Sequence, residues 1–253
     1  MAASTHEPRR RLDETLVERG LSPSRSRARD TIARGMVRVD GAMVDKPGKT
    51  VPADAAIEID DPARGYVSRA ALKLIAALDA FGADPKGRTA LDVGASTGGF
   101  TQVLLERGAA HVIAVDVGHG QLHPSLGGDA RVTSLEGVNA RELDRAQIGG
   151  AEFDLVVADV SFISLKLALP PALDMAMAGA VAVLLVKPQF EAGREAVGKG
   201  GLVRDKALAE RIASDMQAWL DDQPGWRSIG VMASPIEGGD GNREYLLAGR
   251  KDR

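Results

Sequence analysis

Four short runs rich in Val, Ile and Leu recur in the later part of the sequence and constrain the fold more than any other feature. They read TALDVG, HVIAVDVG, FDLVVADV and AVAVLLVKP. Stretches with helical spacing separate them, the first over residues 70–78. Continuously apolar strands that alternate with helices are typical of a parallel sheet with both faces covered. Residues 66–253 are therefore predicted to form one doubly wound α/β domain.

Composition excludes several classes of protein and site. The chain has no cysteine, which excludes disulfides, zinc sites with thiolate ligands and cysteine nucleophiles. His111, His119 and His123 share no metal-ligand spacing, so we expect no metal requirement. The longest apolar run, Met175–Val186, is too short to span a bilayer and reads as a helix end followed by a buried strand. The polar, basic start MAASTHEPRRR does not resemble a secretory signal, so we expect no membrane partner and a cytoplasmic location.

A small module is predicted over residues 9–60. Apolar residues recur at helical spacing over residues 12–19 and 24–34, with Gly35 where the second helix would stop. Val37 and Val39 alternate before the turn signal Asp40-Gly41, and a second strand is expected over residues 56–59. The charged, Pro- and Gly-containing residues 61–65 are predicted to form a linker.

Charge is unevenly distributed along the chain. Residues 1–50 carry 11 Lys or Arg and 7 Asp or Glu, whereas the whole chain has a net charge of −3. A basic end on an acidic body suggests an anionic partner, although a solvated charged surface is an equal alternative on charge alone.

The run RLDETLVERGLSPSRSRARDTIARGMVRVDG resembles the S-four type RNA-binding module. The resemblance implies a scaffold that presents basic residues from its second helix and the following strand to structured RNA. Arginine suits this role because its planar fork contacts phosphates and stacks on bases. The candidate RNA contacts in this module are Arg11, Arg25, Arg27, Arg29 and Arg34.

The segment LDVGASTGGF combines a strand with a glycine-rich turn, but it lacks the G-x-G-x-x-G order of dinucleotide sites. It resembles the first motif of S-adenosylmethionine-dependent methyltransferases. Asp116 ends the next strand, where a carboxylate can accept hydrogen bonds from ribose hydroxyls. The resemblance also implies that the segment LEGVNARE lies near the adenine of the cofactor and that Asn139 contacts it. The candidate cofactor residues are Asp92, Gly94, Ser96, Thr97, Gly98, Gly99, Asp116 and Asn139.

A second glycine-containing segment, GREAVGK at residues 193–199, matches part of a phosphate-binding P-loop. Gly200 stands where that loop needs Ser or Thr, so a basic loop near the active site is the better interpretation. Lys199 and Arg204 are then further candidates for RNA contacts.

Four segments, YVSRAALKL, LDVGASTGGF, ADVSFISL with LVKPQFE, and GNREYLL, resemble the TlyA-type ribosomal RNA methyltransferases. That family is similar to the FtsJ-like 2′-O-methyltransferases, and the resemblance implies a catalytic set of Lys73, Asp159, Lys187 and Glu244. Asp159 and Lys187 each follow a strongly apolar strand, which predicts that they share one crevice with the glycine loop. A mutual ion pair with a purely structural role is the alternative.

The resemblance implies methyl transfer from S-adenosylmethionine to a ribose 2′-hydroxyl of cytidine in ribosomal RNA or ribosomal subunits. Lys187 is then the candidate base, because burial after an apolar run and a like charge on Lys73 both favour a neutral amine. The short segment after Glu244 resembles large-subunit enzymes, whereas the basic N-terminus resembles broader ones, so both subunits stay open as targets. A non-catalytic RNA-binding assembly factor and a haemolysin are the alternative functions.

Overall fold

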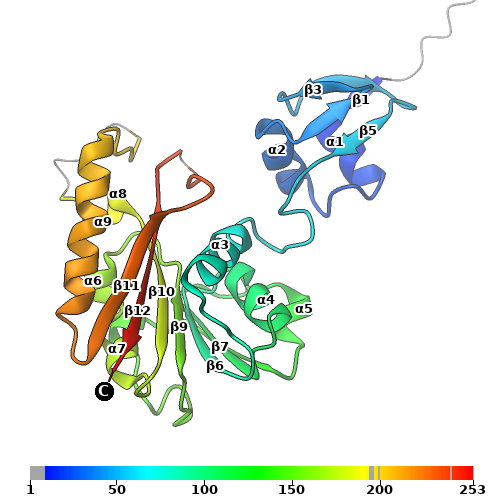
Figure 1. The fold of residues 1–253 in the computed structure, drawn as a ribbon. Coiled ribbons are helices and arrows are strands. Elements are labelled where there is room, and N and C mark those ends of the chain that lie inside the picture. The colour runs from blue at the N-terminus through cyan, green and yellow to red at the C-terminus, as the bar shows by residue number, and fades with distance from the viewer. Residues whose placement is uncertain (1–8, 194–196, 199, 240, 253) are drawn as a thin grey trace, which may run out of the picture. The chain divides into compact units, whose positions relative to one another are not determined.

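The computed structural model describes residues 9–193, 197–198, 200–239 and 241–252. It divides into two compact units, residues 1–64 and residues 65–253 (Figure 1). Each unit has its own hydrophobic core.

The first unit consists of two helices and short strands. Its elements are β1 (Arg9–Arg11), α1 (Leu12–Glu18), α2 (Arg25–Ala33), β2 (Val37–Val39), β3 (Ala42–Val44), β4 (Thr50–Pro52) and β5 (Ile57–Ile59). These bounds confirm both predicted helices and both predicted strands. Strands β1, β3 and β4 were not predicted, because their sequences, RRR, AMV and TVP, show no apolar alternation like that of β2.

The turn between β2 and β3 follows the predicted signal, with Asp40 and Gly41 both at positive φ, 50° and 79°. Residues 61–64, which the sequence assigned to a linker, are instead packed into the first unit. Asp61 accepts hydrogen bonds from Thr31 and Arg34, and Ala63 is fully buried.

The second unit is built on a seven-stranded sheet in the order β11-β12-β10-β9-β6-β7-β8. Its strands are β6 (Thr89–Val93), β7 (His111–Asp116), β8 (Val132–Glu136), β9 (Leu155–Ala158), β10 (Val181–Val186), β11 (Trp226–Ala233) and β12 (Tyr245–Lys251). Strands β6 to β10 pair in parallel, as predicted for β6, β7, β9 and β10, whereas β8 was not among the predicted strands. Strand β12 is antiparallel to both of its neighbours, a reversal that the apolar pattern alone does not predict.

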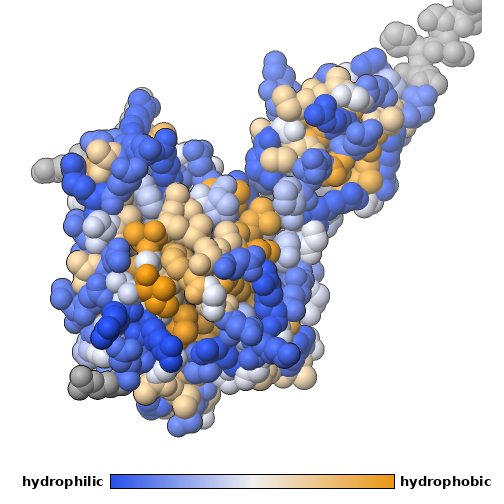
Figure 2. Space-filling view, viewed as in Figure 1, coloured by the Kyte–Doolittle hydropathy of each residue, from blue (hydrophilic) through white to orange (hydrophobic). Residues whose placement is uncertain are grey.

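Helices cover both faces of this sheet (Figure 1). One core packs α6 (Leu165–Ala168), α7 (Pro170–Met175) and α9 (Lys206–Asp221) against it. The other core packs α3 (Ala71–Phe81), α4 (Gly99–Glu106) and α5 (Pro124–Gly127). Two short elements, η1 (Ala140–Glu142) and α8 (Pro188–Glu191), follow β8 and β10. Figure 2 shows apolar residues gathered near the middle of this unit's visible face, with hydrophilic residues around them.

The strand order creates a switch point between β6 and β9. From β6 the chain moves outward to β7 and β8, and it then returns to the other side of β6 with β9 and β10. In sheets of this kind, ligands bind in the crevice outside the carboxyl ends of the strands at the switch point. The loops that follow β6 and β9 are therefore the place to look for a site.

Candidate active site

The glycine loop after β6 lies directly against the loop after β9. The Asp159 amide donates to the Val93 carbonyl at 3.0 Å. Gly94 has a φ of 81°, and a Cβ at this position would lie 2.7 Å from the Asp159 carbonyl oxygen. Only glycine tolerates both conditions, so the two loops can meet only with glycine at position 94.

A cavity of about 620 Å³ opens beside this contact. Polar lining comes from Ser96, Asp116 and Asn139, and apolar walls come from residues such as Val117 and Val138. The Asp116 carboxylate accepts hydrogen bonds from the Ser96 amide at 2.8 Å and from the Gly118 amide at 2.7 Å, which fix its orientation. Hydrogen-bond acceptors between apolar walls suit a nucleoside, which has an apolar base face and a hydroxyl-bearing ribose.

A smaller adjoining cavity of about 150 Å³ shares Gly94, Ser96, Asp159 and Ser161 with the first. Of the eight cofactor residues predicted from sequence, six line one cavity or both: Gly94, Ser96, Thr97, Gly99, Asp116 and Asn139.

The other two predicted cofactor residues, Gly98 and Asp92, line neither cavity. Gly98 is at a φ of 97° before α4, where a Cβ would meet Leu126. Asp92 is fully buried, and it accepts a hydrogen bond from Thr101 of α4 at 2.6 Å. Both residues hold the loop and α4 in place.

Burial is also the main cause that raises the pKa of Asp92, to about 7. Hydrogen bonds from Thr101 oppose the shift, whereas the charges of Asp159 and Asp116 add to it. The Oδ1 atom of Asp92 is buried without a hydrogen-bond partner. A carboxyl group in these surroundings is stabilised in its protonated form.

The four residues predicted to be catalytic form two ion pairs. Lys187 Nζ lies 2.6 Å from Asp159 Oδ1, and it donates a hydrogen bond to Ser161 Oγ at 2.7 Å. Lys73, on α3, pairs with Glu244, just before β12, at 2.5 Å. Lys73, Lys187 and Glu244 are each less than a tenth exposed.

The ion pair between Lys187 and Asp159 is the contact that a purely structural role would also produce. Such a role does not explain why Asp159, Ser161 and Lys187 all line the same small cavity as the glycine loop. The structure also modifies one expectation, because the charge of Lys73 is countered by Glu244. Lys73 therefore contributes less repulsion to Lys187 than the sequence suggested.

An exposed aromatic ring beside this site was not predicted from the sequence. Phe162 is 91% exposed, has a φ of 66° and lines the larger cavity. Its ring centroid lies 5.3 Å from that of Phe190, and Lys187 Nζ lies 6.0 Å from the Phe190 ring centroid. The motif ADVSFISL contains this residue, but nothing in the sequence distinguishes an exposed phenylalanine from a core one.

Several of the arginines predicted to bind RNA form ion pairs or hydrogen bonds within the first unit. Arg11 and Arg25 each lie 3.0 Å from the buried carboxylate of Asp13. The hydrogen bond from Arg11 is the main cause that lowers the pKa of Asp13, and Arg25 adds to it. These contacts orient both arginines and occupy part of their donors.

Two further arginines of the set contribute to the packing of residues 61–64. Arg34 pairs with Asp61 at 2.6 Å, and Arg27 donates to the Ala63 carbonyl at 3.0 Å. Arg29 and Arg204 are exposed. Lys199 lies outside the described residues.

No described helix is long and apolar enough to cross a membrane. Within the same described ranges, no three His, Cys, Asp or Glu side chains are grouped so that they could hold a metal ion.

Comparison with known proteins identifies both parts of the chain. The FtsJ-like methyltransferase family model matches residues 66–251, and the S4 domain model matches residues 10–57. The 16S/23S rRNA (cytidine-2′-O)-methyltransferase TlyA of Mycobacterium tuberculosis is 51% identical over 94% of this chain and 89% of its own length. Hemolysin A of Brachyspira hyodysenteriae is 40% identical over 93% of this chain and 98% of its own. A solved structure described as a hemolysin from Streptococcus thermophilus has a TM-score of 0.76 and 39% identity, covering 96% of this chain and 89% of its own. The chain therefore belongs to the FtsJ-like methyltransferase family, with an S4 domain before the methyltransferase domain.

Proposed function

We propose that this enzyme methylates the ribose 2′-hydroxyl of cytidine in ribosomal RNA and uses S-adenosylmethionine as methyl donor. The observation that carries the proposal is the meeting of a buried lysine, a carboxylate and a hydroxyl, Lys187, Asp159 and Ser161, with the glycine loop in one cavity. A ribosomal substrate also favours a cytoplasmic location.

The larger cavity supports the choice of cofactor. Asp116 and Asn139 would hold the ribose and the base of the adenosine, and the loop of Gly94 and Ser96 would face the methionine end. When bound, S-adenosylmethionine supplies an electrophilic methyl group on its sulfonium.

The protein's own task is to hold the ribose hydroxyl and to remove its proton. Lys187 in its neutral form accepts that proton, and Asp159 then stabilises the ammonium at a distance of 2.6 Å. The second pair, Lys73 with Glu244, is buried and lines neither cavity, so its part in the reaction is proposed from the family motif alone. Positioning and proton transfer together are sufficient for this reaction type.

The RNA substrate is supported by the S4 domain and by the Mycobacterium tuberculosis relative, whose name specifies cytidine in 16S and 23S rRNA. Phe162 is suited to stack on a base that has left its helix, because its ring is exposed beside the catalytic pair. We accordingly propose both ribosomal subunits as targets.

Transfer of a radiolabelled methyl group onto isolated ribosomal subunits that lack the modification tests the proposal. We expect Lys187→Ala to abolish transfer while the affinity for S-adenosylmethionine changes by less than about threefold. Lys187→Arg should not restore activity, because a guanidinium stays protonated. Lys206→Ala, which removes an exposed lysine on α9, is the matched control and should transfer at the wild-type rate.

Turnover close to wild type in either Lys187 variant would remove this residue from the mechanism. A wild-type protein that binds RNA but neither S-adenosylmethionine nor its demethylated product would instead indicate a non-catalytic assembly factor.

A further inference from the structure

Three successive sets of side-chain contacts, here called layers, join two segments that carry the proposed catalytic residues. They are the loop after β9, residues 159–165, and the segment after β10, residues 187–191. The layer nearest the strands consists of Lys187 with Asp159 and Ser161, at 2.6 and 2.7 Å. The next layer is the ring contact between Phe162 and Phe190.

The third layer is formed by Glu191, which the reaction as described does not use. Its Oε2 atom accepts a hydrogen bond from Ser164 Oγ at 2.5 Å, and its Oε1 atom accepts one from the Leu165 amide at 2.8 Å. The Leu165 amide is one of the free donors at the start of α6. One carboxylate thus fixes the point at which the loop from Asp159 ends and α6 begins.

Glu191 and Lys187 are coupled through α8. Lys187 precedes this one-turn helix and Glu191 is its last residue, so the two lie four residues apart on one side of the turn. Both ends of the loop of residues 159–165 are therefore held from α8. Lys187, just before the helix, holds the start of the loop, and Glu191, the last residue of the helix, holds its end. Between these ends lies Phe162, whose positive φ of 66° is unfavourable for a residue with a side chain. A non-glycine residue keeps such a conformation only where its surroundings impose it.

We propose that Glu191 is a positioning residue for the methyl-transfer reaction: by closing the loop of residues 159–165 onto α8, it sets the placement of Asp159, Ser161 and Phe162 relative to Lys187. The inference rests on the proposed function for its kinetic consequence. Its structural consequence, the order of the loop, can be measured independently of activity.

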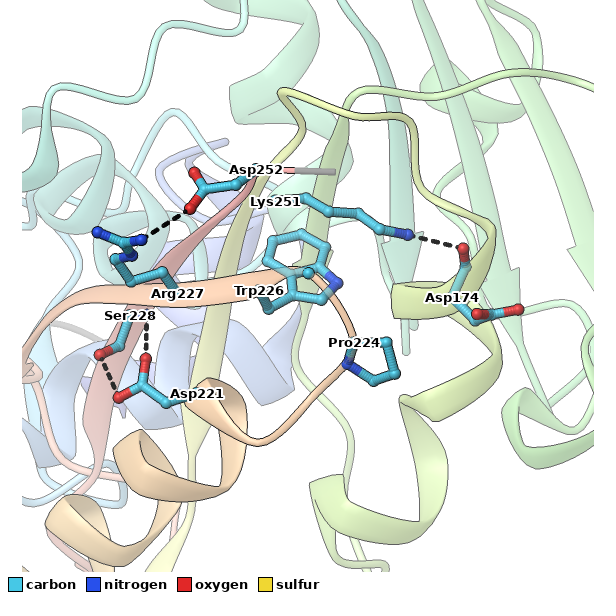
Figure 3. Close-up of a pocket in the computed structure, with 9 residues that line it drawn as sticks. Asp174, Asp221, Pro224, Trp226, Arg227, Ser228, Lys251 and Asp252 are labelled. Carbon is cyan, nitrogen blue, oxygen red and sulfur yellow. Dashed lines mark hydrogen bonds and ion pairs between the residues drawn. The ribbon is translucent and has the colours of Figure 1, made fainter.

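A matched control exists at the other end of the strands, away from the catalytic residues. Asp221, at the end of α9, also accepts one hydrogen bond from a backbone amide and one from a serine hydroxyl, both of Ser228, at 2.5 and 2.9 Å. Figure 3 shows this pair. Ser228 lies near the start of β11, whereas the catalytic residues follow the ends of β9 and β10. Asp221→Ala therefore removes the same type of contact far from the reaction.

The experiment compares Glu191→Ala, Glu191→Gln and Asp221→Ala in the full-length protein. At saturating S-adenosylmethionine and ribosomal subunits, we expect kcat to fall about 10- to 100-fold in Glu191→Ala, the loss that follows from misplacing reacting groups. The affinity for S-adenosylmethionine, measured by calorimetry, should fall by a smaller factor than kcat, because residues of the loop also line the larger cavity. Glu191→Gln should recover most of kcat, because an amide can accept from Leu165 and donate to Ser164. Asp221→Ala should keep the kcat of the wild type.

Hydrogen–deuterium exchange of peptides that cover residues 159–165 is the second measurement. We expect faster exchange in Glu191→Ala than in the wild type, and wild-type exchange in the other two variants. Unchanged exchange in Glu191→Ala would overturn the inference, whatever the enzyme's activity. So would wild-type kcat in Glu191→Ala, equal loss of kcat in Asp221→Ala, or failure of Glu191→Gln to recover kcat. A wild-type protein that transfers no methyl group would contradict the proposed function, and the exchange experiment would still decide the role of Glu191.

Discussion

Asp92 is the residue at which motif and structure differ most clearly. Its place in LDVGASTGGF suggested a cofactor contact, yet the side chain is fully buried and lines neither cavity. Its carboxyl group accepts a hydrogen bond from Thr101, and so connects β6 to α4. Burial raises the pKa of Asp92 from 3.8 to about 7, so folding takes up a proton at this group.

The sign of the resulting pH dependence follows directly. The unfolded chain loses this proton near pH 4 and the folded chain near pH 7, so the stability of the folded state falls as pH rises between these values. Asp92→Asn should therefore raise the free energy of unfolding by roughly 2–4 kcal/mol at pH 8, and by much less near pH 4. Urea unfolding at the two pH values measures the difference. The same stability difference between Asp92→Asn and the wild type at both pH values would contradict this account. So would a loss of S-adenosylmethionine affinity in Asp92→Asn as large as the loss in Asp116→Ala.

At the scale of elements, Lys251 of β12 caps the C-terminal end of α7. Its ammonium donates to the carbonyls of Leu173, Asp174 and Ala176 at 2.9, 2.7 and 2.9 Å. Figure 3 shows the side chain reaching toward Asp174, and both residues line a surface hollow of about 830 Å³. Cations stabilise helix C-termini because the last carbonyls lack partners within the helix.

Lys251→Met should destabilise the second unit by about 2–4 kcal/mol, because all three carbonyls lose their bond to the ammonium. The Leu173 carbonyl keeps a partner in Trp226 Nε1, at 3.1 Å. Arg250→Met removes an exposed charge from the same strand and should change the stability by less than about 0.5 kcal/mol. Thermal unfolding compares the two variants, and equal effects would show that Lys251 does not cap α7.

The elements also show what the sequence could and could not predict. Strands β6, β7, β9 and β10 were found from their apolar runs, because burial on both faces removes polar residues from a strand. The direction of β12 was not found, since pairing with β10 is a long-range contact without a local pattern. The motifs brought Asp159 and Lys187 together correctly. Ser161 and Glu191 were missed because the catalytic set implied by the resemblance does not include them, and no local pattern shows their contacts with Lys187 and Ser164.

At the scale of the whole molecule, the charge asymmetry is smaller than the first 50 residues suggest. The first unit, residues 1–64, has 12 basic and 11 acidic residues, because four acidic residues lie between positions 54 and 61. Two of its acidic side chains, Asp13 and Asp61, are buried against arginines. RNA binding by this unit must therefore depend on where exposed arginines lie rather than on net charge.

Arg29 offers a clearer test of RNA binding by the first unit than Arg25 does. Reversing the charge of Arg25 would leave the buried carboxylate of Asp13 beside a like charge. Arg29→Glu should weaken RNA binding and reduce the slope of log affinity against log salt by about one. Arg211→Glu, the same exposed change on α9, should alter both much less. Titrations at several salt concentrations measure this, and equal effects of the two variants would exclude a specific contact at Arg29.

The antiparallel course of β12 has a consequence for the order in which the enzyme is completed during synthesis. Strand β11 pairs only with β12 within the seven-stranded sheet, and β12 also covers the outer edge of β10. Until β12 has been translated, β11 has no neighbouring strand in this sheet and β10 presents an open edge. Glu244 immediately precedes β12, and it is the partner of Lys73 from the first helix of the second unit. A nascent chain thus gains the partner of β11 and the ion pair between Lys73 and Glu244 in the same step, when β12 emerges.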